Sequence, residues 1–242
     1  MSTTDPSQPA ILPAATIHFV DAMRVSVEMA EALNEEIQSR ITDIEQWVNA
    51  GNHLSRQLAL RLTLPMWSFV DVTHRLREFV QQAPGLKQKL PKLQQFIRAT
   101  QSVKPLRNHV QHFRTDIAKM PEKGTPIWGV ISWVASTDPN RCFAFAVGSS
   151  HPNLGFYSIA IDTHQMKFAQ RLILSVNNVL VDVPDVLSRI REAATVIEEW
   201  AEKNGCPSIG NPMLLQMMID PALVAAFNNR ATEPGAIETG MT

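Results

Sequence analysis

The hydrophobic pattern of the chain changes its period near residue 121, and this change limits the folds that are possible. Upstream, apolar residues recur every three or four positions, as in helices that bury one face. Downstream of Pro121-Glu122-Lys123-Gly124, apolar and polar residues alternate, and Ile, Val, Phe and Trp become common, as in half-buried strands. We therefore predict a mainly helical α+β protein, in which an antiparallel β-meander is inserted between an antiparallel helical bundle and a further C-terminal helix.

Four amphipathic segments precede the change of period and form the predicted bundle. They cover residues 13–51, 53–83, 86–102 and 105–120. Pro65 is expected to kink the second segment or divide it into two helices. Pro91 and Pro105 suit first helical turns, where a missing N–H costs little. Short connections containing proline or glycine join the segments, which favours antiparallel packing.

The alternating part of the sequence contains four strand-like segments and a short return arm. These are residues 127–134, 141–149, 155–163, 171–176 and 179–181. Phe143 and Phe145 alternate with alanines, which gives this strand one bulky face that can pack on helices. The apolar spacing then predicts a helix over residues 184–204.

These elements predict a simple domain organisation. A single globular domain is expected over residues 13–205, with the bundle at 13–120 and the meander at 126–182. Residues 1–12 are expected to be a disordered lead, and residues 206–242 to hold short helices and a disordered tail.

Composition excludes several classes of protein. With 45% hydrophobic and 19% charged residues, the chain has the balance of an ordinary globular protein. Apolar runs are too short for a membrane span, and a secretion signal is lacking, so no membrane association is expected. Cys142 and Cys206 have neither zinc-binding nor redox spacing, and a reducing cytoplasm is the expected location.

Charge is distributed unevenly, although the net charge is only −1. Between Asp21 and Glu45 there are seven acidic residues and two arginines, and we interpret them as a solvated helix face in preference to an acidic docking surface. Between Pro84 and Gly124 there are nine lysines and arginines and two acidic residues. The basic stretch suits contacts with RNA phosphates, or equally a solvated face opposite the acidic helix.

The segment from Pro105 to Met120 holds the densest cluster of chemically useful side chains. Its apolar stripe consists of Leu106, Val110, Phe113, Ile117 and Met120. The polar residues that border this stripe are Asn108, His109, His112 and Asp116 on one flank and Arg107 and Arg114 on the other.

The sequence Arg107-Asn108-x-x-x-His112 resembles the Arg-x4–6-His motif of the HEPN superfamily, in which the arginine is often followed by a polar residue. The resemblance covers at most residues 14–120 and the predicted helix near the C-terminus, at residues 184–204. It implies a helical bundle with the activity of a metal-independent endoribonuclease of the kind found in toxin and defence systems. In such enzymes the RNA 2′-hydroxyl attacks the adjacent phosphate, and the motif residues act across a two-fold dimer interface.

The resemblance implies a catalytic role for each of three residues. His112 would transfer protons near neutral pH, and Arg107 would hold the phosphate and stabilise the charge that develops on it. Asn108 would hydrogen-bond the imidazole or the phosphate.

The same resemblance implies RNA as substrate, a homodimer, and an antitoxin-like protein as a possible partner. Lys104, Arg114 and Lys119 are the candidate contacts with the RNA backbone. Neither a metal nor another cofactor is expected.

The spacing of Arg107 and His112 constrains this mechanism. Side chains five positions apart on a helix are separated by about 140° around its axis. The two groups meet most easily when each comes from a different subunit. The competing interpretation is that Arg107 forms an ordinary surface ion pair and that His112 caps a polar seam.

Three other interpretations use residues of the same region or of the sheet. His109, His112 and Asp116 have a spacing that suits a metal site, and Asp71 and His74 are candidates to complete a site from the second helix. A non-catalytic, HEPN-like binding and dimerisation module is the alternative function. Its partner surface would be formed by Trp128, Trp133 and Tyr157 on the sheet.

Overall fold

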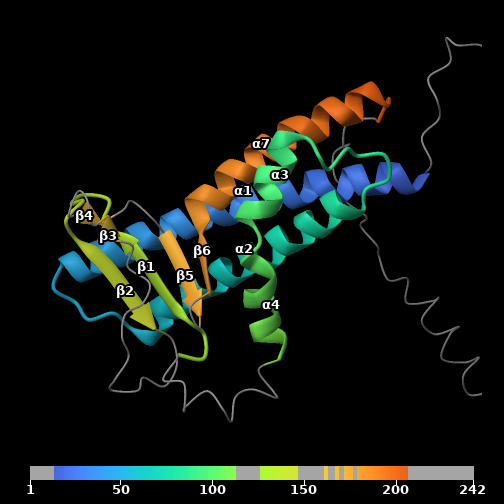
Figure 1. Cartoon of the computed structure of the whole chain (residues 1–242). Helices are drawn as coiled ribbons and strands as arrows, with labels where there is room; N and C mark the ends of the chain where they lie inside the picture. The colour runs from blue at the N-terminus through green and yellow to red at the C-terminus, as the bar shows by residue number, and fades with distance from the viewer. Residues whose placement is uncertain are drawn as a thin grey trace, which may run out of the picture. The chain divides into compact units, whose positions relative to one another are not determined.

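The structure is a computed structural model that describes residues 14–112, 126–146, 161–162, 167–168, 172–176 and 179–206. All of these belong to one compact unit that extends to Ser208. The predicted lead at 1–12 and almost all of the predicted tail at 206–242 lie outside the described residues. The mainly helical α+β class, with an antiparallel sheet, is confirmed (Figure 1).

The two longest helices of the described chain form an antiparallel pair. Helix α1 spans Ala14–Asn49 and ends before Gly51, whose φ of 82° suits glycine. Helix α2 spans Arg56–Gln82 and is continuous through Pro65. Of the two outcomes expected at Pro65, a division into two helices is therefore wrong, and a kink stays a prediction. Burial explains the continuity, because Leu62 and Met66 on either side of Pro65 are fully enclosed in the core.

Two shorter helices follow. Helix α3, Pro91–Ala99, begins at Pro91 as predicted and packs mainly against α7, a later helix that spans Val183–Lys203. Helix α4, Val103–Gln111, packs on α2 and begins two residues before Pro105, which still lies in its first turn. The rest of this predicted helix, residues 113–120, lies outside the described part of the chain.

Six strands are described, four of which form one antiparallel sheet. The sheet contains β1 (Val130–Val134), β2 (Cys142–Ala146), β5 (Leu172–Val176) and β6 (Val179–Asp182). Their order is β2-β1-β5-β6, so β1 pairs with β5 and the strands do not follow one another in chain order. A separate ribbon pairs β3 (Ile161–Asp162) with β4 (Lys167–Phe168), and the sequence did not predict β4.

One face of the sheet packs into the same core as the helices. Trp133 of β1 lies opposite Phe143 of β2, and their rings stack with centroids 5.3 Å apart. Phe145 meets Trp133 edge-on, at 6.0 Å. Phe143 and Phe145 thus provide the bulky face that their alternation with alanines predicted.

The end of α1 is joined to the sheet by a buried carboxylate. Glu45 is only 4% exposed, and it accepts hydrogen bonds from Trp133 Nε1 at 3.0 Å and from the backbone N–H of Ser136 at 3.1 Å. The Ser136 hydroxyl also donates to this carboxylate. The interpretation of the acidic residues of α1 as one solvated face is therefore wrong for Glu45, because neutral donors satisfy its charge inside the protein.

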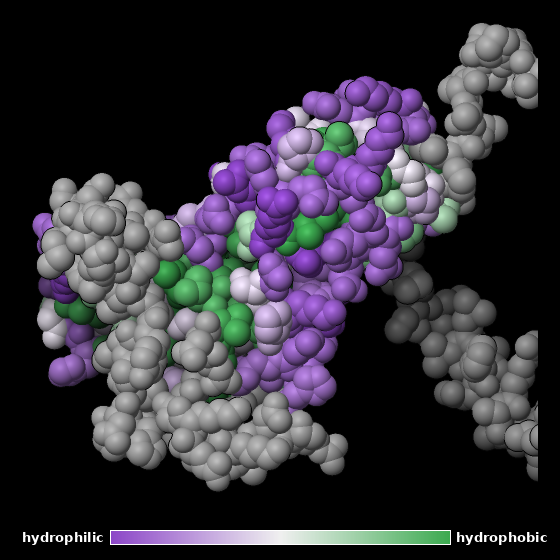
Figure 2. Space-filling view, in the orientation of Figure 1, coloured by the Kyte–Doolittle hydropathy of each residue, from purple (hydrophilic) through white to green (hydrophobic). Residues whose placement is uncertain are grey.

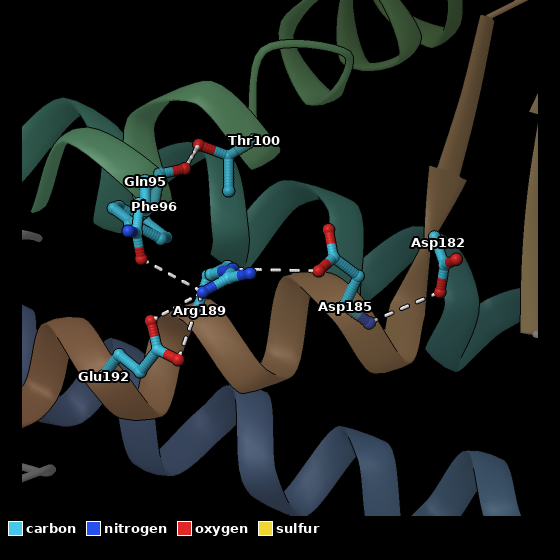
Figure 3. A network of polar contacts seen from close by, with 7 residues as sticks. All are labelled: Gln95, Phe96, Thr100, Asp182, Asp185, Arg189 and Glu192. Carbon is cyan, nitrogen blue, oxygen red and sulfur yellow. Dashed lines mark hydrogen bonds and ion pairs between the residues drawn. The ribbon is translucent and has the colours of Figure 1, made fainter. Parts of the chain in front are cut away.

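Helix α7 is held against its neighbours by ion pairs as well as by its apolar stripe. Arg189 pairs with Asp185 and Glu192 on its own helix and donates to Gln95 of α3 at 3.1 Å (Figure 3). Arg24 of α1 pairs with Glu198 at 2.7 Å. Helix α7 packs against α1 and α3 and also contacts β5 and β6 of the sheet.

The outward surfaces of the helices are mostly hydrophilic on the face seen in Figure 2, and hydrophobic residues gather over β5 and β6. In the described part of the chain, no helix combines the length and the apolar character that crossing a bilayer requires.

Candidate active site

Helix α4 brings the motif arginine against α2. Leu106 of α4 is 1% exposed and fixes which side of the helix faces the core. The neighbouring Arg107 donates from Nε to Asp71 Oδ1 at 3.1 Å. The other oxygen of Asp71 accepts from Arg75 Nε at 2.8 Å. One carboxylate on α2 therefore holds two guanidinium groups, one from each helix.

The Arg107 guanidinium is fixed in place but not enclosed. Its side chain is 29% exposed, and its second contact is from Nη1 to the side-chain oxygen of Gln111 at 3.4 Å. A guanidinium carries five N–H donors in a planar fork, and Asp71 orients that fork through Nε. The arrangement suits the binding of a second anion, such as a phosphate, beside Asp71.

His74 lies behind this ion pair, on the buried side of α2. It is 5% exposed, and its Nε2 is 3.8 Å from Glu78 Oε1. Burial lowers the pKa of His74 below its usual value, and the positive charges of Arg107 and Lys104 lower the pKa further, against the opposing effect of Glu78 and Asp71. The imidazole is therefore neutral at pH 7.

His112 stands at the end of α4 as its C-cap. Its backbone N–H donates to the carbonyl oxygen of Asn108 at 2.9 Å, and the residue is exposed. The hydrogen bonds of Arg107 go to Asp71 and Gln111. Within one chain, the structure therefore directs the motif arginine towards α2, while the motif histidine stands at the exposed end of α4.

The backbone carbonyl of Asn108 accepts the hydrogen bond from the backbone N–H of His112. Its predicted side-chain contact with the imidazole or a phosphate remains a prediction. The residue itself is partly exposed on α4, one turn before His112.

The predicted metal site of His109, His112 and Asp116 is only partly described. His109 Nε2 is 3.1 Å from the carbonyl oxygen of Ile127, which can only accept, so this nitrogen carries the proton. Asp116 lies outside the described residues. Within those residues, no group of three or more histidine, cysteine, aspartate or glutamate side chains is arranged to hold a metal.

The predicted RNA contacts are only partly described. Lys104 is exposed in the first turn of α4, whereas Arg114 and Lys119 lie outside the described residues. The basic residues that precede α4 all face solvent: Lys87, Lys89, Lys92, Arg98. Their exposure agrees with both interpretations of the basic stretch.

The proposed aromatic partner surface is wrong for Trp133, which is 3% exposed and bonded to Glu45. Trp128 is 39% exposed, and its carbonyl oxygen accepts from Trp67 Nε1 of α2 at 3.3 Å. Tyr157 lies outside the described residues. Of the two described tryptophans, Trp133 therefore belongs to the core and Trp128 is the more exposed.

Sequence reasoning named Asp71 and His74 but missed Arg75 and Glu78. The sequence did contain a signal for these two partners, namely a spacing of four residues on one helix. Arg75 follows Asp71 at this spacing, and Glu78 follows His74. This spacing could not indicate that another helix, α4, packs against the cluster. Only the packing of α4 on α2 brings Arg107 to this cluster.

Comparison of the chain with known protein families, curated proteins and solved structures gives no match. The resemblance to the HEPN superfamily therefore depends on the Arg107–His112 motif and its helical context alone.

Proposed function

We propose that this protein is a HEPN-like, metal-independent endoribonuclease of the type found in toxin and defence systems, with Arg107 as its phosphate-binding group. The observation that carries the proposal is the orientation of the Arg107 guanidinium by Asp71 at 3.1 Å while 29% of the side chain stays exposed. An arginine that is fixed but accessible is suited to a phosphate, because little side-chain freedom is lost on binding.

In this mechanism the RNA 2′-hydroxyl attacks the adjacent phosphorus, and the bond from phosphorus to the 5′-oxygen breaks. His112 takes part in moving the proton from the attacking oxygen to the leaving oxygen, as a general base or acid. Arg107 holds the phosphate oxygens and stabilises their developing negative charge. Asn108 positions the imidazole or the phosphate, and Lys104 contacts the RNA backbone.

The site is shared between two chains. Arg107 is bonded to Asp71 of α2, and His112 stands at the exposed end of α4, five positions along the chain. That spacing separates the two side chains by about 140° around a helix axis, which supports a site built from two subunits. A two-fold dimer supplies His112 from one subunit and Arg107 from the other. Neutral His74 adds no charge behind the guanidinium at pH 7, so the net positive charge that a phosphate meets comes from the arginines and Lys104.

The proposal is tested by incubating purified full-length protein with total RNA in EDTA. Wild type should cleave, and His112→Ala should reduce the rate by about 100-fold or more, the usual scale for loss of a general acid or base. His53→Ala is the matched control, because His53 is an exposed histidine in the loop between α1 and α2. Equal cleavage by wild type and His112→Ala, or no cleavage by either, contradicts the proposal.

A second candidate is a non-catalytic binding and dimerisation module. It is favoured by one observation, that the Arg107 guanidinium already has a carboxylate partner and needs no phosphate to complete its charge. Under this alternative, RNA is not cleaved by wild type, and Arg107→Ala leaves RNA binding unchanged.

A further inference from the structure

A cavity with a volume of about 300 Å³ lies where α1, the sheet and the start of α7 meet. The buried residues that line it come from α1, from β1 and the position after it, and from β5: Ile41, Glu45, Trp133, Ala135, Leu172. The exposed lining residues Gln38, Ser136 and Pro184 mark its opening to solvent. Apolar walls with a few polar groups are typical of a site for a small ligand.

Glu45 is the one charged residue among the described residues that line this cavity. Its described hydrogen-bond partners are the indole N–H of Trp133 and the backbone N–H and hydroxyl of Ser136. These donors stabilise the carboxylate but bring no formal positive charge. A carboxylate that is 4% exposed and has only neutral partners favours a cation in the adjoining cavity.

The three donors leave part of the carboxylate available to a ligand. A carboxylate has about four acceptor sites, two on each oxygen. Oε1 accepts from Trp133 Nε1 at 3.0 Å and from the Ser136 backbone N–H at 3.1 Å. Oε2 accepts from the Ser136 hydroxyl and shares the backbone N–H at the longer distance of 3.3 Å. The remaining acceptor site is therefore on Oε2.

A single open acceptor site favours an ammonium over a guanidinium. An ammonium is a compact charge whose N–H groups bond separately, so one acceptor is enough to hold it. A guanidinium binds a carboxylate best through two parallel hydrogen bonds, one to each oxygen. Because both sites of Oε1 are already used, Glu45 cannot offer that arrangement.

The apolar lining favours a ligand in which the ammonium is attached to a short alkyl chain. Ile41, Ala135 and Leu172 present hydrocarbon to the cavity, and methylene groups placed there are removed from water. The exposed Gln38 and Ser136 at the opening allow the other end of such a ligand to reach solvent.

We propose that this cavity binds a primary alkylammonium group, supplied by a small amine or by a lysine side chain. The ammonium donates to Oε2 of Glu45, and the alkyl chain lies along Ile41 and Leu172. None of the hydrogen bonds of Glu45 has to break, so the contact between α1 and the sheet is kept. The cavity shares no described lining residue with the site of Arg107 and Asp71, and the proposal is independent of RNA cleavage.

The test is a titration of the ¹⁵N-labelled full-length protein with n-butylamine at about pH 7, where an alkylamine is protonated as lysine is. The indole N–H signal of Trp133 is the readout, because this group bonds the same carboxylate. We expect saturable binding with a dissociation constant below about 10 mM. Butan-1-ol has a similar shape without the charge, and it should bind at least about tenfold more weakly. Propylguanidinium should also bind more weakly than butylammonium.

Variants of the lining test where the amine binds. Glu45→Gln removes the charge and should weaken binding of butylamine by at least about tenfold. Because this change also alters a buried contact, a second variant is needed. Gln38→Arg adds bulk and positive charge at the opening, on an exposed position, and should weaken binding at least about fivefold. Ser39→Arg is the matched control, since it adds the same charge one position along α1, outside the lining, and should leave binding within about twofold.

Circular dichroism verifies that each variant is folded. Nα-acetyl-lysine methylamide identifies the source of the ammonium: affinity equal to that of butylamine supports a lysine side chain, and binding of butylamine alone supports a small free amine. The proposal is overturned when butan-1-ol or propylguanidinium binds as tightly as butylammonium, or when butylamine gives no saturable shift of the Trp133 signal. Equal affinities of folded Gln38→Arg and Ser39→Arg also overturn it.

Discussion

Two carboxylates of this protein each join a helix to another element, and their surroundings differ. Glu45 of α1 is 4% exposed, and its partners are neutral donors from Trp133 and Ser136. The side chain of Asp71 on α2 is 39% exposed, and its partners are the guanidinium groups of Arg75 and Arg107. The first joint is enclosed within the core, and the second is open to solvent.

The difference indicates the role of each contact. We call the contact of Glu45 with Trp133 and Ser136 the Glu45 joint, and that of Asp71 with Arg75 and Arg107 the Asp71 joint. A buried carboxylate that loses its donors is left unsatisfied in a medium of low polarity, so the Glu45 joint serves to hold α1 against the sheet. An ion pair exposed to water contributes little to stability. The Asp71 joint therefore costs the fold little when a ligand rearranges it, which is the property that a binding site needs.

The largest expected effect on stability belongs to the enclosed joint. Glu45→Ala leaves the Trp133 indole N–H and the Ser136 N–H without their acceptor, and should lower the free energy of unfolding by about 3 kcal/mol. Urea denaturation measures this loss. A change below about 1 kcal/mol would show that water reaches these donors and that the joint is not closed.

Replacing Asp71 should change stability little and RNA cleavage more. Asp71→Ala should lower the free energy of unfolding by at most about 1 kcal/mol, because the pair is solvent-screened. It should nevertheless reduce RNA cleavage by about tenfold, because Arg107 loses the group that orients it. Asp71→Glu, which keeps the charge, should recover part of the rate. Equal stability losses for Asp71→Ala and Glu45→Ala would remove the distinction between the two joints.

The smallest expected effect concerns pH and His74. Its pKa in the folded protein lies below the unfolded value of about 6.5, so the unfolded chain binds the proton first as the pH falls. The stability contributed by neutral His74 is complete above about pH 6.5 and is lost as the pH falls from there towards the folded pKa. His74→Gln should therefore show a flatter decline of stability between about pH 7 and pH 5 than wild type.

The readout of that experiment is the difference in slope between the two proteins, since carboxylates titrate in both. An NMR titration of His74 gives the same information directly. An imidazole pKa at or above the unfolded value would contradict the burial of this residue beside Arg107.

Local patterns predicted the elements of the fold well. The start of α3 at Pro91 and the end of α1 before Gly51 follow from the geometry of proline and glycine alone. The alternation around Phe143 predicted the face of β2 that packs on Trp133. Pro65 does not divide α2, because the stabilisation by the core on both sides of it outweighs the loss of one hydrogen bond.

Tertiary partners could not be predicted in the same way. Glu45 belongs to an acidic run that has the composition of a solvated face, and only the approach of β1 reveals its burial. The pairing of Arg107 with Asp71 joins residues 36 positions apart in the sequence, and no local period encodes it. The motif gave the identity of the candidate groups, whereas the packing of α4 on α2 gave their surroundings.

The most direct test of the shared site is complementation between two inactive chains. His112→Ala and Arg107→Ala are purified separately, mixed under conditions of demonstrated subunit exchange, and assayed for RNA cleavage in EDTA. The account predicts that each variant alone is inactive and that the mixture regains part of the wild-type rate, because one of the two sites in a mixed dimer contains both groups. A mixture that remains inactive after exchange would contradict a site built from Arg107 of one chain and His112 of the other.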